Sequence, residues 1–308
     1  RHLDGRKAPG SIINVASVIG LCLKRMFGAS LVFDMRGFWA DEKVDAGHWR
    51  TQSALYRWAK RWERRLFQEA DAIVSLTQAG VRAFASLGYD IPPRPIIEVI
   101  PTCADLTRFA PGPKDPALVE QLRLRDRMVV GCVGTLSNWY LRESTLRYLA
   151  LLIHRLPATV LCVTREDHAR LRADALAAGI PEAHLVVTHA TFEAMPAYLR
   201  VMDVGVVFIK ASFSKRGSAA TKLGELLATG VPVVINDGVG DSGALIRAHQ
   251  AGVVLSDLTP SACEASIEQV RQMASDPEVR ARCRRAAETC FDLNDGIRKY
   301  LEVYRQLE

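Results

Sequence analysis

The sequence predicts an α/β protein built on doubly wound parallel sheets, and three observations indicate this fold class. From Met128 onward, short apolar runs alternate with amphipathic stretches at intervals of roughly 20 to 30 residues, the pattern of strand–helix units. A shorter series of the same kind precedes Met128. The chain has 308 residues, 49% hydrophobic and 24% charged, which is typical of a globular chain long enough for two domains.

The part after Met128 contains six candidate strands: MVVGCV, ATVLCV, HLVVT, DVGVVFI, VPVVIN and AGVVLS. With five intervening helices they make one complete doubly wound domain, predicted to span residues 128–290. The final stretch, 291–308, has apolar residues at helical spacing and is predicted to form a closing helix.

The part before Met128 contains only three candidate strands: SLVFDM, DAIVSL and PIIEVI. A long helix over residues 48–70 and a shorter one near 78–87 are predicted between them. Residues 1–110 are therefore predicted to form an incomplete domain of the same kind, which a linker over 111–127 joins to the next domain.

The start of the chain and its cysteines bear on its length and location. RHLDGRKAPG carries no strand signal, and the chain begins without methionine, so we expect a truncated or altered start. The seven cysteines show no CxxC spacing, which indicates neither a zinc site nor a disulfide framework. Without a signal peptide, this usage favours a reducing cytoplasm.

The net charge of +6 indicates an anionic partner. No zinc finger, RNP-type aromatic strand or basic tail accompanies the charge, so nucleic acid is disfavoured as that partner. A phosphate-bearing small molecule or an anionic membrane surface fits the charge equally well.

The run SAATKLGELLATGVPVV predicts a helix over residues 218–229 that leads into a buried strand. Cations gather at and just before its start: Lys215, Arg216 and Lys222. The amino end of a helix carries about half a positive charge and disfavours cations there. An anion bound at the helix start would explain them, with Gly217 and Ser218 allowing the backbone to approach it closely.

Two interpretations of Lys222 remain open at this point. It can be a solvated side chain that pairs with Glu225 at i,i+3, a contact worth roughly 0.2–0.5 kcal/mol. It can also face a phosphate, because the helix start follows the carboxyl edge of a strand, where open α/β sheets bind ligands.

The run SFSKRGSAATKLGELLATGVPVVINDGVGD resembles the donor-binding segment of retaining glycosyltransferases of the family-4 type, which have the two-domain GT-B fold. VIPTCADLTRF is similar to the family's "IPNGVD…F" turn, GCVGTLSNWY to the first strand and glycine loop of its C-terminal domain, and YLRVMDVGVVF to the strand before its donor site. The resemblance runs from about Ser17 to the end of the chain. It implies two Rossmann-like doubly wound domains, the N-terminal one incomplete.

The resemblance also implies which residues bind a nucleotide-diphosphate sugar. Glu225 corresponds to the acidic residue that holds the ribose hydroxyls in the family. Lys222, with Ser218 and Thr221, is similar to the family's "SPTK" variant and would grip the diphosphate. The other candidate donor contacts are Gly134, Thr135, Lys215, Arg216, Gly217 and Gly240.

Two departures from the family's pattern leave the donor sugar open. The family's common form has a second glutamate eight residues before the ribose-binding one, and Gly217 occupies that position here. The arginine and lysine that usually grip the diphosphate are absent from GTLSNWY.

DGVGDSG contains a literal GxGxxG after a predicted strand, formed by Gly238, Gly240 and Gly243. It does not predict NAD binding, because it follows the fifth strand of its domain and lacks an acid about 20 residues onward at a strand end. Its amides could contact the donor, or it is a simple glycine turn.

The segment FDMRGFWADE follows a predicted strand, which would place its charges at a sheet edge facing the interdomain cleft: Asp34, Arg36, Asp41 and Glu42. Arg36 takes the place where family members often have a histidine, and it could stabilise the leaving phosphate or orient the acceptor. An Asp34–Arg36 pair that braces the loop is the alternative. The candidate catalytic residues are thus Arg36, Asp34 and Lys222, with no assigned general base.

The helix predicted over 48–70 carries cations on one arc: Arg50, Arg57, Lys60, Arg61, Arg64 and Arg65. Leu55, Trp58, Trp62 and Leu66 lie largely opposite. Such a helix can rest on anionic headgroups, which would make the protein peripheral to the inner face of the membrane. It can equally be a core helix with a solvated cationic face.

The resemblance implies a hexosyltransferase-like enzyme that transfers a sugar, with retention, from a nucleotide-diphosphate sugar to a glycan, lipid-linked or small-molecule acceptor, in cell-envelope or exopolysaccharide biosynthesis. The protein's main task would be to stabilise negative charge on the leaving diphosphate. No cofactor is expected, and the absence of DxD and of metal-ligand histidine spacing predicts metal independence. The alternatives are a GT-B sugar-nucleotide epimerase and a non-catalytic nucleotide-sugar-binding remnant.

Overall fold

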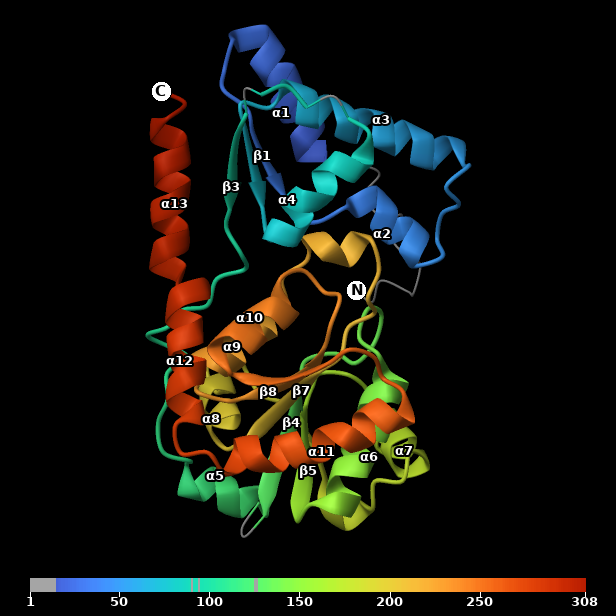
Figure 1. Ribbon diagram of the computed structural model, residues 1–308, viewed down its shortest axis with the longest axis vertical. Helices are drawn as coiled ribbons and strands as arrows, with labels where there is room; N and C mark the ends of the chain where they lie inside the picture. The colour runs from blue at the N-terminus through green and yellow to red at the C-terminus, as the bar shows by residue number, and fades with distance from the viewer. Residues whose placement is uncertain (1–14, 90, 94, 125–126) are drawn as a thin grey trace, which may run out of the picture.

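The chain folds around two β-sheets that lie at opposite ends of the molecule in the computed structural model (Figure 1). The structure describes residues 15–308 except 90, 94, 125 and 126, so the segment 1–10 lies outside the described residues. All strand pairings within both sheets are parallel. The predicted α/β class with parallel sheets is confirmed.

The smaller sheet contains the three strands predicted before Met128, in the order β1-β2-β3. Its strands are β1 (Val32–Met35), β2 (Ala72–Ser75) and β3 (Ile96–Val99), and its helices are α1 (Val15–Phe27), α2 (Trp39–Asp45), α3 (Ala54–Glu69) and α4 (Gln78–Phe84), the last continued by the 3₁₀ turn η1 (Ala85–Leu87). A small aromatic core supports it: the ring of Phe67 lies edge-on to Phe33 and Phe84, at centroid distances of 5.6 and 4.8 Å.

The larger sheet contains the six strands predicted after Met128, in the order β6-β5-β4-β7-β8-β9. The strands are β4 (Met128–Val133), β5 (Ala158–Val163), β6 (Leu185–Thr188), β7 (Val204–Val207), β8 (Val233–Asn236) and β9 (Gly252–Leu255). The helices between them are α6 (Arg142–Arg155), α7 (His168–Ala177), α8 (Met195–Arg200), α9 (Thr221–Ala228) and α10 (Ser242–His249), with 3₁₀ turns η2 (Glu182–His184) and η3 (Ser214–Gly217). The order reverses between β4 and β7, so the carboxyl ends of these strands border the switch point where such sheets bind ligands.

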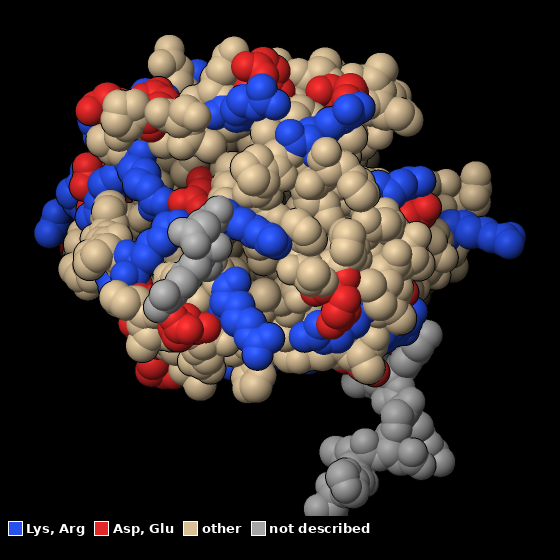
Figure 2. All heavy atoms as spheres, turned by 90° about the horizontal axis from the view of Figure 1, so that it is seen from below, with Lys and Arg blue, Asp and Glu red and all other residues tan. Residues whose placement is uncertain are grey.

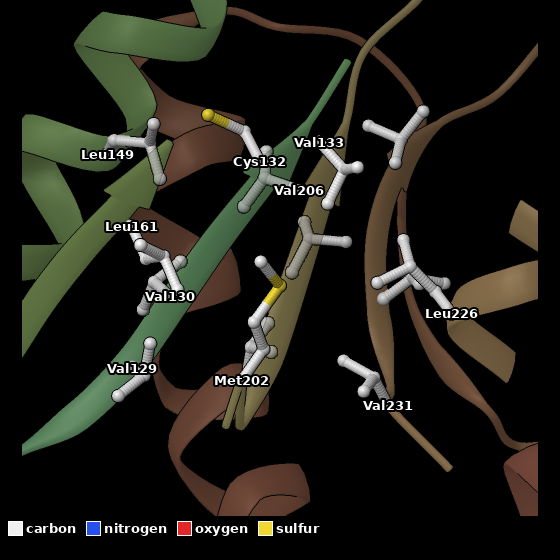
Figure 3. Close-up of a cluster of buried hydrophobic side chains, with 14 of the residues drawn as sticks. Val129, Val130, Cys132, Val133, Leu149, Leu161, Met202, Val206, Leu226 and Val231 are labelled. Atoms are coloured by element: carbon white, nitrogen blue, oxygen red, sulfur yellow. The ribbon is translucent and has the colours of Figure 1, made fainter. Parts of the chain in front are cut away.

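The main core lies around the larger sheet. Figure 3 shows side chains of β4 and β7 packed beside Met202 and Leu226, all of which are buried. Gly131 of β4 lies opposite Gly205 of β7, and a Cβ atom on Gly131 would overlap the Met202 side chain. The two strands that flank the switch point are therefore fixed by close packing.

The chain crosses between the sheets twice. The predicted linker 111–127 is not an open connection, because it contains helix α5 (Pro116–Gln121), whose Leu118 is buried in the main core. After α11 (Pro260–Ser275) and α12 (Val279–Cys290), α13 (Leu293–Arg305) returns to the smaller sheet and lies beside β3 (Figure 1). Lys299 Nζ of α13 donates to Val99 O at 3.2 Å.

Three predicted boundaries differ from the structure. The helix predicted from residue 218 begins at Thr221, because η3 and an extended residue precede it. The helix predicted from residue 48 begins at Ala54, where Ser53 Oγ accepts a hydrogen bond from the Tyr56 amide. The predicted loop FDMRGFWADE contains the start of helix α2.

Candidate functional site

The amino end of α9 lies at the switch point of the larger sheet. Lys222 is in its first turn, and its ammonium approaches the loop after β4: a Cβ atom on Gly134 would lie 3.2 Å from Lys222 Nζ. Gly134 has φ +78°, a conformation that glycine adopts readily, so the loop passes close to the lysine without strain. The structure thus brings together Lys222 and Gly134, with Thr135 and Thr221 exposed nearby in the chain.

Lys222 is half-buried and faces an aromatic ring. Its Nζ lies 3.5 Å from the centroid of the Tyr140 ring. Burial lowers the pKa of Lys222 to about 8, although Cys132, Glu225 and Glu166 act in the opposite direction. Within the described part of the chain it forms no ion pair shorter than 4 Å, so the predicted solvated pair with Glu225 does not form.

The first turn of α9 has no side-chain cap. Amides in a first helical turn have no partner inside the helix. Thr221 and Lys222 occupy its first two positions. A buried cation and open backbone donors at one point make this end of α9 suited to bind an anion.

Glu225 lies one turn further along α9, on the same side as Lys222. Its side chain is half-buried, and burial raises its pKa, with Lys222 partly offsetting the rise. Thr229, one turn after Glu225, is fully buried, and its hydroxyl donates to Glu225 O at 2.8 Å. Glu225 is therefore a half-buried carboxyl group beside Lys222 on one side of α9, and its contact with a ribose stays a prediction.

Lys215 and Arg216 do not lie at the start of α9. Both belong to η3, and Lys215 is only 6% exposed. Its Nζ donates to Glu42 Oε1 of α2 at 2.6 Å and lies 3.8 Å from the Trp139 ring centroid. Lys215 thus already has a carboxylate partner, and the exposed Arg216 lies against the Phe213 ring, so of the three cations only Lys222 is in the first turn of α9.

Gly217 and Ser218 lie where the two parts of the chain, each built around one sheet, pack against each other. A Cβ atom on Gly217 would lie 3.2 Å from the ring of Phe38 in the loop after β1. Any side chain at this position would therefore press on the ring of Phe38, which is fully buried. The Ser218 amide donates to Lys215 O at 3.2 Å, so it is not the open donor that the sequence indicated.

Gly240 is likewise a packing residue. Its φ is +49°, its amide donates to Lys215 O at 2.9 Å, and a Cβ atom there would overlap Ser218 O. The Gly238 amide also has a partner within the protein, Asp237 Oδ1 at 2.9 Å, which favours the glycine turn for DGVGDSG, and a contact with the donor stays a prediction. Next to it, Asp241 accepts hydrogen bonds from the amides of Gln78 and Ala79 at the start of α4.

Asp34 and Arg36 form the bracing pair that the sequence offered as one alternative. Arg36 Nε donates to Asp34 Oδ2 at 3.0 Å, and the Arg36 side chain is 65% exposed. Burial raises the pKa of the Tyr300 phenol of α13 to about 12, and the charge of the nearby Asp34 adds to the rise. No hydrogen bond or ion pair in the described part of the chain joins this pair to Lys222, and a role for it at the phosphate stays a prediction.

The sequence did not identify the aromatic loop or the acid beside it. Trp139 and Tyr140 hold the two lysines, and Glu166, after β5, accepts from the Leu136 amide at 3.2 Å and from Arg142 Nη2 at 2.7 Å. Ser137, Arg142 and Glu166 border a hollow of about 290 Å³. The available signal was the position of both segments after neighbouring strands, at one edge of the sheet.

A second, larger hollow of about 510 Å³ is bordered by different residues around the α9 start. It is bordered by Ala219 and Leu223, by α10 and by Lys299 of α13. In the described residues, no group of three or more His, Cys, Asp or Glu is placed to hold a metal ion. No helix among these residues is long and apolar enough to cross a bilayer.

Comparison with solved structures shows the GT-B fold. Sucrose-phosphate synthase from Thermosynechococcus elongatus matches with a TM-score of 0.72 and 17% identity over 95% of this chain and 71% of that one. HepE from Anabaena, solved with UDP-glucose, matches with a TM-score of 0.72 and 17% identity over 96% and 77%. The pneumococcal O-GlcNAc transferase GtfA, solved with UDP and GlcNAc, matches with a TM-score of 0.65 and 15% identity over 96% and 55%.

No protein-family model matches the chain, and no curated protein does. The structures above share its GT-B fold, as the sequence predicted.

Proposed function

We propose that this protein is a glycosyltransferase that uses a nucleotide-diphosphate sugar as donor and transfers the sugar with retention. The observation that carries the proposal is the half-buried Lys222 at the switch point, which has an aromatic partner and no carboxylate partner within 4 Å in the described residues. A buried cation of this kind is costly unless an anion joins it. A diphosphate at the start of α9 would supply that anion.

Donor binding would use two points on one side of α9. Lys222 and the amides of the first turn would hold the diphosphate, and Glu225 would hold the ribose hydroxyls. HepE was solved with UDP-glucose, which supports a nucleotide sugar as ligand of this fold. During transfer, negative charge grows on the leaving diphosphate, and Lys222 would stabilise it.

The test is a panel of UDP-, GDP- and TDP-sugars, each incubated with the protein with and without chelator, followed by product analysis. Release or transfer of the sugar, with the anomeric configuration kept, is the expected result, and it should persist in chelator. Conversion of the donor sugar to its epimer would instead support the sugar-nucleotide epimerase, which no described feature of the site favours. Binding without turnover would indicate a non-catalytic remnant, and no binding of any member would refute the proposal.

We also infer that α3 contacts an anionic membrane, where a glycan or lipid-linked acceptor would be available. Arg57, Arg61 and Trp58 are exposed on this helix, while Glu63 is turned inward, where it hydrogen-bonds Lys60 and Tyr89. In contrast, the face of the larger-sheet end in Figure 2 shows Lys and Arg interspersed with Asp and Glu.

Cosedimentation with vesicles tests this contact. Binding to vesicles with anionic headgroups but not to neutral ones is expected, and it should weaken in the Arg57→Gln/Arg61→Gln variant. Arg147→Gln/Arg271→Gln removes two cations from α6 and α11 and serves as the control. Equal retention of all variants, or binding to neutral vesicles alone, would contradict a role for α3.

A further inference from the structure

Lys215 and Lys222 each lie against an aromatic ring of the loop after β4. Lys215 Nζ is 3.8 Å from the Trp139 ring centroid, and Lys222 Nζ is 3.5 Å from that of Tyr140. Trp139 and Tyr140 are neighbours in the loop after β4, while the lysines come from the connection between β7 and α9 and from α9 itself. The switch point is therefore bridged by two adjacent cation–π contacts.

Backbone hydrogen bonds hold the main chain of Tyr140 beside the end of β7. Tyr140 forms an antiparallel bridge with Ile209, just after β7. The Leu141 amide donates to Phe208 O at 3.1 Å, and the Lys210 amide donates to Trp139 O at 2.8 Å. These bonds tie the backbone of the loop to the segment after β7, so the Tyr140 Cα, from which the ring extends toward Lys222, has a fixed place.

The two contacts differ in what else holds the cation. Lys215 has Glu42 as a full negative partner, which neutralises it. The face of a tyrosine ring carries only the partial negative charge of its quadrupole. It therefore holds an ammonium in place while leaving its positive charge available to an incoming anion.

We propose that Tyr140 is a positioning residue, whose ring holds the Lys222 ammonium at the switch point in readiness for the donor's diphosphate. The proposal rests on the proposed donor site. It explains how a loop without the arginine and lysine of related sequences still serves a diphosphate: the loop supplies an aromatic support, and α9 supplies the cation.

The first experiment does not depend on any ligand. In protein with ¹³C-labelled lysine, the ε-methylene protons of Lys222, assigned with Lys222→Arg, should be shifted upfield by the ring current of Tyr140. The shift should persist in Tyr140→Phe and disappear in Tyr140→Leu. An unshifted Lys222 signal in the parent protein would overturn the proposal whatever the function of the site.

The second experiment measures the affinity for UDP, GDP and TDP by calorimetry, as a double-mutant cycle with Lys222→Met. Tyr140→Phe should bind within about twofold of the parent, because the ring face is kept. Tyr140→Leu should weaken diphosphate binding about 5- to 20-fold in the parent, yet have little effect in the Lys222→Met background, since its action passes through the lysine. Trp139→Leu is the matched control and should change affinity little, because Glu42 still holds Lys215.

The outcomes separate the two proposals. If the parent binds a nucleoside diphosphate and Tyr140→Leu binds it equally well, or loses as much affinity in the Lys222→Met background, the role of Tyr140 is refuted and the donor site stands. If no nucleoside diphosphate binds the parent, the donor site is refuted, and the role of Tyr140 falls with it. Circular dichroism and thermal melting identify any variant that fails to fold, and Tyr140→Trp then tests whether an aromatic side chain alone restores binding.

Discussion

Lys215 and Lys222 lie seven residues apart, each against an aromatic ring, yet the structure gives them different partners. Lys215 is almost fully buried and ion-paired with Glu42, so it joins the loop before α9 to helix α2 of the smaller sheet. Lys222 is half-buried and has the Tyr140 ring, with no carboxylate within 4 Å in the described residues. Both lysines belong to one sequence motif, but only their partners distinguish them. A lysine paired with a carboxylate stabilises the fold, whereas a lysine without one has its charge available for a ligand.

The largest contrast is expected from removing the charge of each lysine in turn. Lys222→Met should weaken nucleoside diphosphate binding about 10- to 100-fold, since a hydrogen bond to a charged group is worth about 1.5–3 kcal/mol. Calorimetric titration measures the effect. Lys215→Met should bind the same ligand within about threefold of the parent. If Lys215→Met lost as much affinity as Lys222→Met, the distinction between the two lysines would be wrong.

For the free energy of unfolding, we expect Lys215→Met to have the larger effect and Lys222→Met the smaller one. Lys215→Met leaves Glu42 without its partner at a contact between the two sheets, which should lower the free energy of unfolding by about 1–3 kcal/mol. Lys222→Met removes a buried cation and should leave stability unchanged or raise it. Urea unfolding followed by circular dichroism measures both. Lys215→Met combined with Glu42→Gln should recover part of the loss, and no recovery would argue against the ion pair.

The affinity for a nucleoside diphosphate should depend on pH through Lys222. Because the pKa of Lys222 is lowered to about 8, the protonated form that binds an anion is depleted as the pH rises through that value. Affinity for a nucleoside diphosphate should fall about tenfold between pH 7 and pH 9. Titrations across this range with Lys222→Arg as control, which keeps its charge, should show a flat profile for the variant. A flat profile in the parent would contradict a buried, titrating lysine.

The lowered pKa of Lys222 also affects the free energy of unfolding, which should rise with pH where the ligand affinity falls. The folded pKa of Lys222 lies below its ordinary value of 10.5, so between about pH 8 and 10.5 the unfolded chain binds more protons than the folded one. The contribution of Lys222 to the free energy of unfolding therefore rises with pH in this window. Subtracting the profile of Lys222→Met from that of the parent isolates it.

The smallest effect is expected at Glu225. Glu225→Gln should weaken UDP binding about fivefold, because an amide accepts a weaker hydrogen bond from a ribose hydroxyl than a carboxylate does. The 2′,3′-dideoxy analogue of the ligand should bind parent and variant alike. Glu268→Gln on the outer face of α11 is the control. An equal loss for both ligands would show that Glu225 does not contact the ribose.

The sequence predicted most of the fold because hydrophobic periodicity is local. Each of the nine strands predicted from an apolar run is present among the described residues, and the predicted parallel pairing is confirmed. Helix starts were less accurate: residues 218–220 fit a helical wheel, but η3 occupies the preceding residues and the helix begins at Thr221.

The candidate site was only partly predictable, since its partners are distant in sequence. Lys222 and Gly134 follow from their places at neighbouring strand ends. The pairing of Lys215 with Glu42 crosses between the two sheets and has no local signal. The same holds for the Phe38 ring against Gly217, a close approach that favours a glycine there. Asp34 and Arg36 are two residues apart, so their pairing could be anticipated.

The most direct test of the central claim is the proton uptake that accompanies ligand binding. Calorimetry of nucleoside diphosphate binding at pH 8 in buffers of different ionisation enthalpy measures the number of protons taken up. A site centred on Lys222 predicts uptake of up to about half a proton per ligand in the parent and in Lys215→Met, and none through this group in Lys222→Met. Binding without proton uptake, or equal uptake in Lys222→Met, would contradict the claim that Lys222 receives the diphosphate.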